Sequence, residues 1–190
     1  VAFDSRLELK LAVDECYSSP SVDYSTCRYG PIVEWDVSRV IDMSYMFQSQ
    51  KSFVNDISKW DVSSVVDMSN VFRGAKAFAS DVSKWDVSSA TDMSYMFYYA
   101  TSFTGDLSKW DVSRVDQMGA MFNGATSFNV DLSKWDVTRV KSMDGMFNSA
   151  SEFAQTLRGT WQTSKADKYD MFEESSGRVS RKSTIADQNA

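Results

Sequence analysis

Apolar residues recur along most of this chain at one fixed spacing. Between residues 35 and 160 a Trp-Asp-Val triplet returns every 25 residues, and each unit later carries a methionine and two phenylalanines. The tryptophans of the triplets are Trp35, Trp60, Trp85, Trp110 and Trp135. A period kept through five consecutive units is typical of repeat proteins, in which each unit buries its apolar face against its neighbours.

One segment of each unit has the spacing of a short helix. In the third unit Met93, Met96, Phe97 and Ala100 are apolar at positions i, i+3, i+4 and i+7. This spacing places them on one face of a helix about two turns long. Asp92 stands directly before them, where a carboxylate accepts an amide hydrogen bond and favours a helix N-terminus. We therefore predict one short helix in each unit.

A second segment alternates in the manner of a short strand. Ile57, Trp60 and Val62 turn inward in this interpretation, and Lys59 and Asp61 face solvent. One strand and one helix cannot cover their own apolar surface, so the units stack and their strands form a parallel ladder. The predicted fold class is an α/β repeat solenoid with one short parallel strand and one short helix in each 25-residue unit.

The repeat resembles known sequence patterns. Ile57-x-x-Trp60-x-Val62 matches the Leu-x-x-Leu-x-Leu pattern of leucine-rich repeats. The stretch 85–110, WDVSSATDMSYMFYYATSFTGDLSKW, resembles the units of BspA-like leucine-rich-repeat surface proteins at nearly every motif position, and the resemblance covers about residues 31–160. The resemblance implies a leucine-rich-repeat-like fold and a binding role, with many such proteins secreted or displayed on a surface.

Both ends of the chain depart from the repeat, as capping segments do. We predict an N-terminal helix and loop cap over residues 1–34, five repeats over 35–160, a degenerate C-terminal cap over 161–172, and a polar tail over 173–190. The tail has little to bury, so we expect it to be ordered by lying on a partner.

The N-terminal cap is predicted to begin with a helix over residues 4–16. Asp4 or Ser5 would start it, and Leu7, Leu11 and Cys16 would lie on its apolar side. Such a helix can cover the open end of the first repeat.

Two cysteines, Cys16 and Cys27, both lie in the N-terminal cap. In an oxidising compartment they close one loop by a disulfide, and the alternative is a pair of buried free thiols. The chain begins at Val1 rather than at methionine, which leaves a removed signal or transit peptide as an open alternative.

Composition argues against several classes of function. The net charge of −6 disfavours binding to nucleic acid or to an anionic membrane through a basic patch. No apolar run approaches the roughly 18 residues of a membrane-spanning helix. Histidine is absent and neither cysteine has the setting of a nucleophile, so we predict that the chain is not an enzyme and holds no cofactor.

Aspartates recur in two sets. For Asp36, Asp61, Asp86, Asp111 and Asp136 we favour a structural interpretation. In it, the repulsion between them is offset by Lys59, Lys84, Lys109 and Lys134. Calcium binding and a contact surface are the minor alternatives. The second set, which we expect to cap turns, is Asp56, Asp81, Asp106 and Asp131. No metal site is therefore predicted.

Specificity is expected at exposed positions that differ between units, because the fold itself requires the repeated ones. We predict a partner-binding surface from Tyr45, Arg73, Lys76, Tyr95, Tyr98 and Tyr99. Tyr98 and Tyr99 are the foremost candidates, since exposed tyrosines are favoured contact residues. The alternative is that one of these two packs against the tail or a neighbouring loop.

The sequence favours a non-catalytic protein–protein interaction or adhesion module with a protein partner, located outside the cell or on its surface. One alternative is an accessory subunit that stabilises a large complex, in an organelle lumen or on the periphery of a membrane. The other is a wall protein that binds glycan or mineral.

Overall fold

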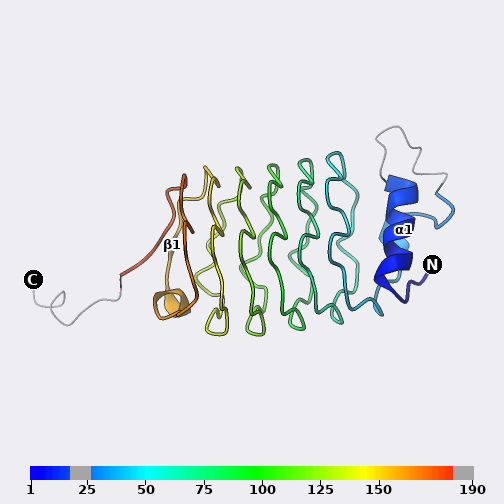
Figure 1. Ribbon diagram of the computed structural model, residues 1–190. Coiled ribbons are helices and arrows are strands. Elements are labelled where there is room, and N and C mark those ends of the chain that lie inside the picture. The colour runs from blue at the N-terminus through cyan, green and yellow to red at the C-terminus, as the bar shows by residue number, and fades with distance from the viewer. Residues whose placement is uncertain (18–26, 182–190) are drawn as a thin grey trace, which may run out of the picture.

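The chain folds into a row of stacked coils with a helix across one end (Figure 1). The computed structural model describes residues 1–17 and 27–181. Its regular elements are the helix α1 (Arg6–Tyr17), the 3₁₀ turns η2 (Ile32–Glu34) and η3 (Gly159–Gln162), and the parallel strands β1 (Thr156–Leu157) and β2 (Arg178–Val179). The coils of the repeat region are therefore held by contacts other than regular helices and sheets.

A ladder of backbone hydrogen bonds joins each coil to the next. Alternate amides of one segment donate to carbonyls of the following unit at 2.8–3.0 Å: Met43 to Asp67, Tyr45 to Ser69, and Phe47 to Val71. Isolated parallel bridges mark the same register from Asp42 to Asp67, Asp92, Gln117, Ser142 and Asp167. Equivalent residues of successive units therefore lie side by side, and we call each such set a column.

The helix predicted for each unit is not formed. The structure has turns over residues 94–99 instead. Tyr95 and Tyr99 have φ of 59° and 53°, in the left-handed region that a right-handed helix excludes. The amides of Met96 and Tyr98 close short turns within the unit. The amides of Tyr95, Phe97 and Tyr99 bond to the next unit. The helix-like spacing of apolar residues thus comes from a run of turns.

The strand predicted around Trp60 is also not formed, although the burial is as predicted. Ile57, Trp60 and Val62 are buried, and Lys59 and Asp61 are exposed. The Trp60 amide donates to the Ile57 carbonyl at 3.1 Å, within its own unit. The Asp61 carboxylate accepts from the amide two residues later at 3.1 Å. These local bonds make turns, so the ladder lies in the other segment of the unit.

Aromatic columns run through the core along the whole stack. One column stacks its rings at 5.5–5.6 Å between centroids and consists of Phe47, Phe72, Phe97, Phe122, Phe147 and Phe172. A second consists of Phe53, Phe78, Phe103, Phe128 and Phe153. Beside them the indole N–H of Trp110 donates to the Val82 carbonyl at 3.1 Å, a bond repeated along the tryptophan column. The tryptophans therefore bury their rings and still satisfy their one polar atom.

Helix α1 covers the first coil. Ser5 precedes it, and its hydroxyl accepts a hydrogen bond from the Glu8 amide at 3.3 Å. The buried face consists of Leu9, Ala12, Val13, Cys16 and Tyr17. The prediction that Leu7 and Leu11 lie on the apolar side is wrong, because they are 67% and 57% exposed. Positions 9, 12, 13 and 16 have the i, i+3, i+4, i+7 spacing that defines one helical face.

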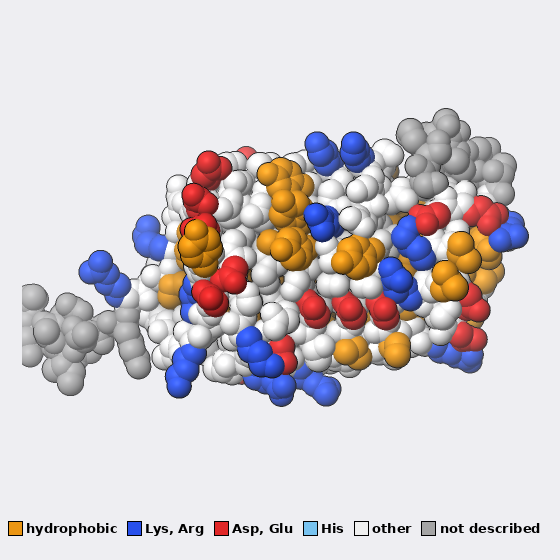
Figure 2. Space-filling model, in the orientation of Figure 1, with side chains coloured by type: hydrophobic (Ala, Val, Ile, Leu, Met, Phe, Trp, Pro, Cys, Tyr) orange, Lys and Arg blue, Asp and Glu red, His pale blue; other side chains and the backbone are white. Residues whose placement is uncertain are grey.

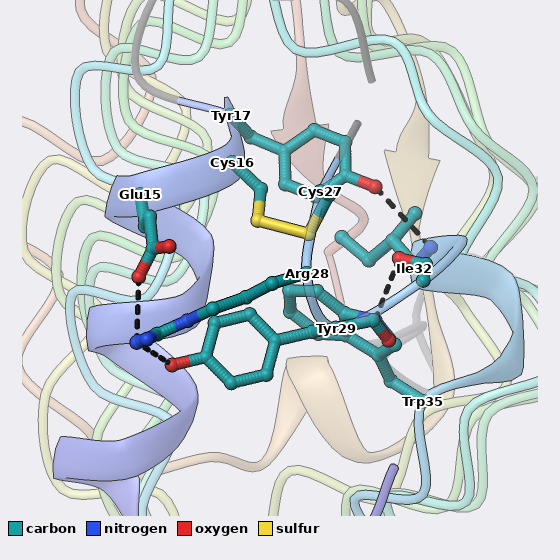
Figure 3. The surroundings of a disulfide bond; sticks show 9 residues. Glu15, Cys16, Tyr17, Cys27, Arg28, Tyr29, Ile32 and Trp35 are labelled. Carbon is teal, nitrogen blue, oxygen red and sulfur yellow. Dashed lines mark hydrogen bonds and ion pairs between the residues drawn. A yellow bond between two sulfur atoms is a disulfide. The ribbon is translucent and has the colours of Figure 1, made fainter. Parts of the chain in front are cut away.

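A disulfide joins Cys16, near the end of α1, to Cys27 (Figure 3). Beside it the Arg28 guanidinium forms an ion pair with the Glu15 carboxylate at 2.8 Å. The bridge and the ion pair attach the segment that leads into the first coil to the helix. Residues 18–26 of the predicted cap loop lie outside the described residues.

At the other end the ladder continues past the five predicted repeats. Asp167 forms a parallel bridge with Ser142, and β2 then pairs with β1. Of the predicted tail, residues 173–181 include β2, and residues 182–190 lie outside the described residues.

Candidate functional site

The two aspartate sets both stabilise turns. Asp81 Oδ1 accepts a hydrogen bond from the Ser83 amide at 2.9 Å, and Asp86 Oδ1 accepts one from the Ser88 amide at 3.0 Å. The prediction that the second set caps turns is confirmed. For the first set the hydrogen-bond partner is the serine or threonine two residues later rather than a lysine.

Acid is expected to destabilise the fold through these carboxylates. Hydrogen bonds from serines hold the pKa below its ordinary value at Asp36, Asp56, Asp81, Asp86, Asp106, Asp111 and Asp131. The unfolded chain then takes up protons first, at a pKa of about 4. The contribution of these carboxylates to the free energy of unfolding is therefore fully present above that value and is lost as pH falls through the folded-state pKa values. Urea denaturation at about pH 6 and about pH 3 measures this, and equal stabilities would contradict it.

The structure brings four of the six predicted partner-binding residues into one cluster. We call Arg73, Tyr95, Tyr98 and Tyr99 the tyrosine cluster. Arg73 Cζ lies 5.4 Å from the centre of the Tyr95 ring and 5.1 Å from that of the Tyr98 ring. The Tyr98 ring centre is 5.5 Å from that of Tyr95 and 4.8 Å from that of Tyr99. The guanidinium therefore bridges the Tyr95 and Tyr98 rings, and the Tyr99 ring contacts that of Tyr98.

The cluster remains open to solvent even though one ring packs on the neighbouring coil. Tyr95 and Tyr99 are 40% and 43% exposed. The Tyr99 ring lies over Gly124, where an added Cβ atom would come within 2.9 Å of it. Tyr99 is thus supported from below by a residue without a side chain and presents its other surface outward.

Tyr95 and Tyr99 stand where the backbone disfavours a bulky residue. All residues of their two columns have positive φ. The column of Tyr95 also contains Tyr45, Asn70, Ala120, Gly145 and Asp170, and that of Tyr99 contains Ser49, Gly74, Gly124, Ser149 and Glu174. Glycine adopts this conformation freely and asparagine adopts it readily, whereas most other residues cost roughly 1–2 kcal/mol. Tyrosine at these two positions therefore lowers stability, and the fold does not require it.

The other two predicted residues lie apart from the cluster. Tyr45 is 40% exposed and lies under the Arg6 guanidinium, whose carbon is 6.0 Å from the ring centre. Lys76 is exposed in the turn that follows its ladder segment. Exposure and variation between units therefore selected six residues, and the structure groups only four of them.

An acidic patch lies further along the columns of the three cluster tyrosines. Asp170, Glu173 and Glu174 occupy these columns near the C-terminal end of the stack, where Figure 2 shows acidic side chains gathered. Asn148 Nδ2 donates to Glu173 Oε2 at 2.8 Å, and Ser149 Oγ donates to Glu174 Oε2 at 2.9 Å. The period runs into residues 167–174, so aligning this stretch with the units would have revealed the patch.

A family model matches the chain over residues 19–119 and again over 81–184, and the family is described as "Mycoplasma protein of unknown function, DUF285". The chain belongs to this family. The two matches to the DUF285 model include the tyrosine cluster, the acidic patch and both aromatic columns. No match was found among curated proteins or among solved structures. Membership in the DUF285 family thus defines kinship and leaves the function to be inferred from the site.

Two further features bear on the classes of function. In the described ranges, 1–17 and 27–181, no helix has the length and apolar character needed to cross a membrane. In the same ranges no three His, Cys, Asp or Glu side chains come together in a group that could hold a metal ion.

Proposed function

We propose that this chain is a non-catalytic protein–protein interaction module and that the tyrosine cluster is its contact surface. One observation carries the proposal: Tyr95 and Tyr99, at left-handed backbone positions that Asn70 and Gly74 fill in the preceding unit, gather with Arg73 and Tyr98 in one exposed cluster. Tyr45 has the same backbone conformation but lies outside this cluster. A surface residue that lowers stability points to a requirement outside the fold. Binding of a partner would explain the tyrosines, because the partner contacts their exposed side chains.

The chemistry of the cluster supports this assignment. Tyrosine and arginine are the residues most enriched among energetically dominant interface contacts. The stacking of Arg73 on Tyr95 and Tyr98 holds both rings in place before a partner arrives, which lowers the entropy lost on binding. In the next unit the same columns carry Ala120 and Gly124, so the rings stand above a surface of small residues.

We also propose the wider setting of the module. The stacked coils belong to the leucine-rich-repeat-like solenoids, and the kinship extends to BspA-like surface proteins, as the motif run in residues 85–110 suggests. The Cys16–Cys27 disulfide supports a place outside the cell or in an oxidising lumen. The lack of histidine supports a role without catalysis.

A double variant, Tyr95→Asn with Tyr99→Gly, tests the proposed function. Each substitution introduces the residue that the same column holds one unit earlier. We expect the free energy of unfolding to stay the same or rise by up to about 1 kcal/mol per site, because backbone strain is relieved. We expect the variant to lose partner proteins that the wild type captures from native membranes and medium, as measured by quantitative mass spectrometry.

The matched control is Tyr45→Asn, which makes the same substitution in the same column, at a φ of 60°, outside the cluster. This control should keep the captured proteins. The proposal fails if the double variant captures all the proteins that the wild type does. Capture that persists after protease treatment of the sample would favour the glycan-binding alternative instead.

A further inference from the structure

The hydrogen-bond ladder is polar along the stack. Four alternate amides in each unit point toward the following unit, and the carbonyls of the same peptide groups point toward the preceding one. The amides just before this segment run the other way, as from Thr91 to Val66. In the fourth unit Met118, Ala120, Phe122 and Gly124 donate to Ser142, Asp144, Met146 and Asn148 at 2.8–3.0 Å. Since all four bonds run in one direction, the last row of the ladder has donors that face no further coil within residues 1–17 and 27–181.

The last row contains Lys168, Asp170, Phe172 and Glu174, which we call the donor edge. Their amides occupy the donor columns of the earlier units, and none has a hydrogen-bond acceptor among residues 1–17 and 27–181. The carbonyls of Lys168, Asp170 and Phe172 each accept a bond within their own unit at 3.0–3.2 Å. Within the described part of the chain these four amides, at every second residue, resemble the open edge of a sheet, which a further chain segment can join.

The opposite end of the ladder is closed by α1. Arg6 Nε donates to the Ser44 carbonyl at 2.8 Å and lies 3.8 Å from the Asp42 carboxylate. The buried side chains of Leu9 and Val13 cover the first coil. A second copy of this chain therefore cannot offer its first row of carbonyls to the donor edge while α1 is in place. The occupant of the edge has to come from a different chain segment.

The donor edge also presents an apolar surface. Phe172 stacks on Phe147 at 5.6 Å by one face, and it is half-buried, whereas the phenylalanines before it in the column are fully buried. An open hollow of about 510 Å³ lies beside it, lined in part by Met171, Arg178 and Val179. A phenylalanine that continued the column would cover the free face of Phe172.

Charge defines the chemistry of the occupant. Asp170, Glu173 and Glu174 are exposed along the edge, and they outnumber the two basic residues that line the hollow, Lys168 and Arg178. Unpaired amide N–H groups stabilise nearby negative charge, as they do at a helix N-terminus. The acidic patch is therefore electrostatically favourable beside the donor edge. An added chain has its side chains in the same columns, directly beside these three carboxylates. Basic side chains there form ion pairs, and acidic ones are repelled.

We propose that the donor edge binds a segment of a partner protein, folded in the same turns as the earlier units, as a further row of the ladder. The segment has the unit's own Met-x-x-Met-Phe pattern, with Lys or Arg in the columns of Asp170, Glu173 and Glu174. Its carbonyls accept from the four amides, its phenylalanine covers Phe172, and its basic side chains pair with the acidic patch. This surface is separate from the tyrosine cluster and does not depend on it.

A labelled nine-residue peptide, Asp-Met-Ser-Lys-Met-Phe-Lys-Lys-Ala, is the probe, and fluorescence anisotropy measures its binding to the intact chain. A peptide with glutamate in place of the three lysines is the control and is expected not to bind. In the protein, D170N with E173Q and E174Q removes the charges and keeps hydrogen-bonding side chains. We expect this triple variant to bind the lysine peptide about tenfold more weakly. The matched variant D61N with D86N and D111N makes the same charge change elsewhere and should bind as the wild type does.

Amide hydrogen exchange by NMR locates the peptide. Exchange at Lys168, Asp170, Phe172 and Glu174 is expected to slow at least tenfold when the lysine peptide is bound, because each amide gains an acceptor. Binding without protection of these four amides overturns the proposal, and so does equal binding of the two peptides or no binding of either. The variant with Tyr95→Asn and Tyr99→Gly is expected to bind the peptide normally. Loss of binding in that variant would show that the peptide binds at the tyrosine cluster, and the proposal for the donor edge would then be wrong.

Discussion

Replacing Phe97 by alanine is expected to remove about 3–5 kcal/mol from the free energy of unfolding. Phe97 has 0% exposure, and its ring lies between those of Phe72 and Phe122, 5.5 Å from each. It also stacks on Phe103 at 4.1 Å within its own unit. The backbone ladder holds the coils at a fixed spacing, so the structure cannot collapse into the space that the ring leaves.

The matched comparison is Phe172→Ala, which makes the same change at the open end of the column. One face of the Phe172 ring is free, so we expect a loss of only about 1–2 kcal/mol there. Urea denaturation followed by tryptophan fluorescence and circular dichroism measures both losses. Equal losses at the two positions would show that stacking along the column contributes nothing beyond the burial of a single ring.

Replacing Cys16 and Cys27 together by serine is expected to destabilise the N-terminal cap by about 3 kcal/mol. The disulfide closes a loop with a sequence separation of 11. Without the bridge the unfolded chain regains the entropy of that open loop, which accounts for the expected loss. Cys16 is 2% exposed, so serine at this position also buries a hydroxyl in an apolar site.

The effect of the missing disulfide should be local. Near the bridge the Tyr17 ring lies 5.8 Å from the Trp35 ring, and the Tyr17 hydroxyl accepts a bond from the Ile32 amide at 3.2 Å (Figure 3). These contacts are lost when α1 separates from the first coil. Hydrogen exchange should therefore speed up in α1 and stay slow in the ladder around Phe97. Wild-type protein in a reducing agent should behave like the variant, and the variant should not respond to the reductant. Equal loss of protection in α1 and in the central coils would contradict this expectation.

The periodic sequence by itself determined which side chains are buried. The recurring Trp, Met and Phe positions are the buried ones, and the polar positions between them, such as Lys59 and Asp61, are exposed. The reason is that stacked units with apolar residues at the same positions bury those residues against one another. The Asp-x-Ser pairs likewise form their turns through bonds that span only two residues.

The backbone conformation of the ladder segment was decided only by the tertiary structure. Met93, Met96 and Phe97 fit a helix by spacing, and the local sequence contains no residue that excludes one. Tyr95 has a positive φ in a segment whose alternate amides bond to the next unit, its own amide to the Gly119 carbonyl at 2.9 Å. A bond between residues so distant in the sequence leaves no local signal, so the helix was the natural and incorrect prediction.

The same division applies to the functional surfaces. The sequence singled out Tyr98 and Tyr99 because they vary where the other units are small or polar, and the period alone implies that Arg73 and Tyr98 share a column. Only the structure separates Tyr45 and Lys76 from the cluster and stacks Arg73 on two rings. The donor edge depends on the tertiary structure entirely, because four amides point the same way only when the turns of the whole stack set their direction.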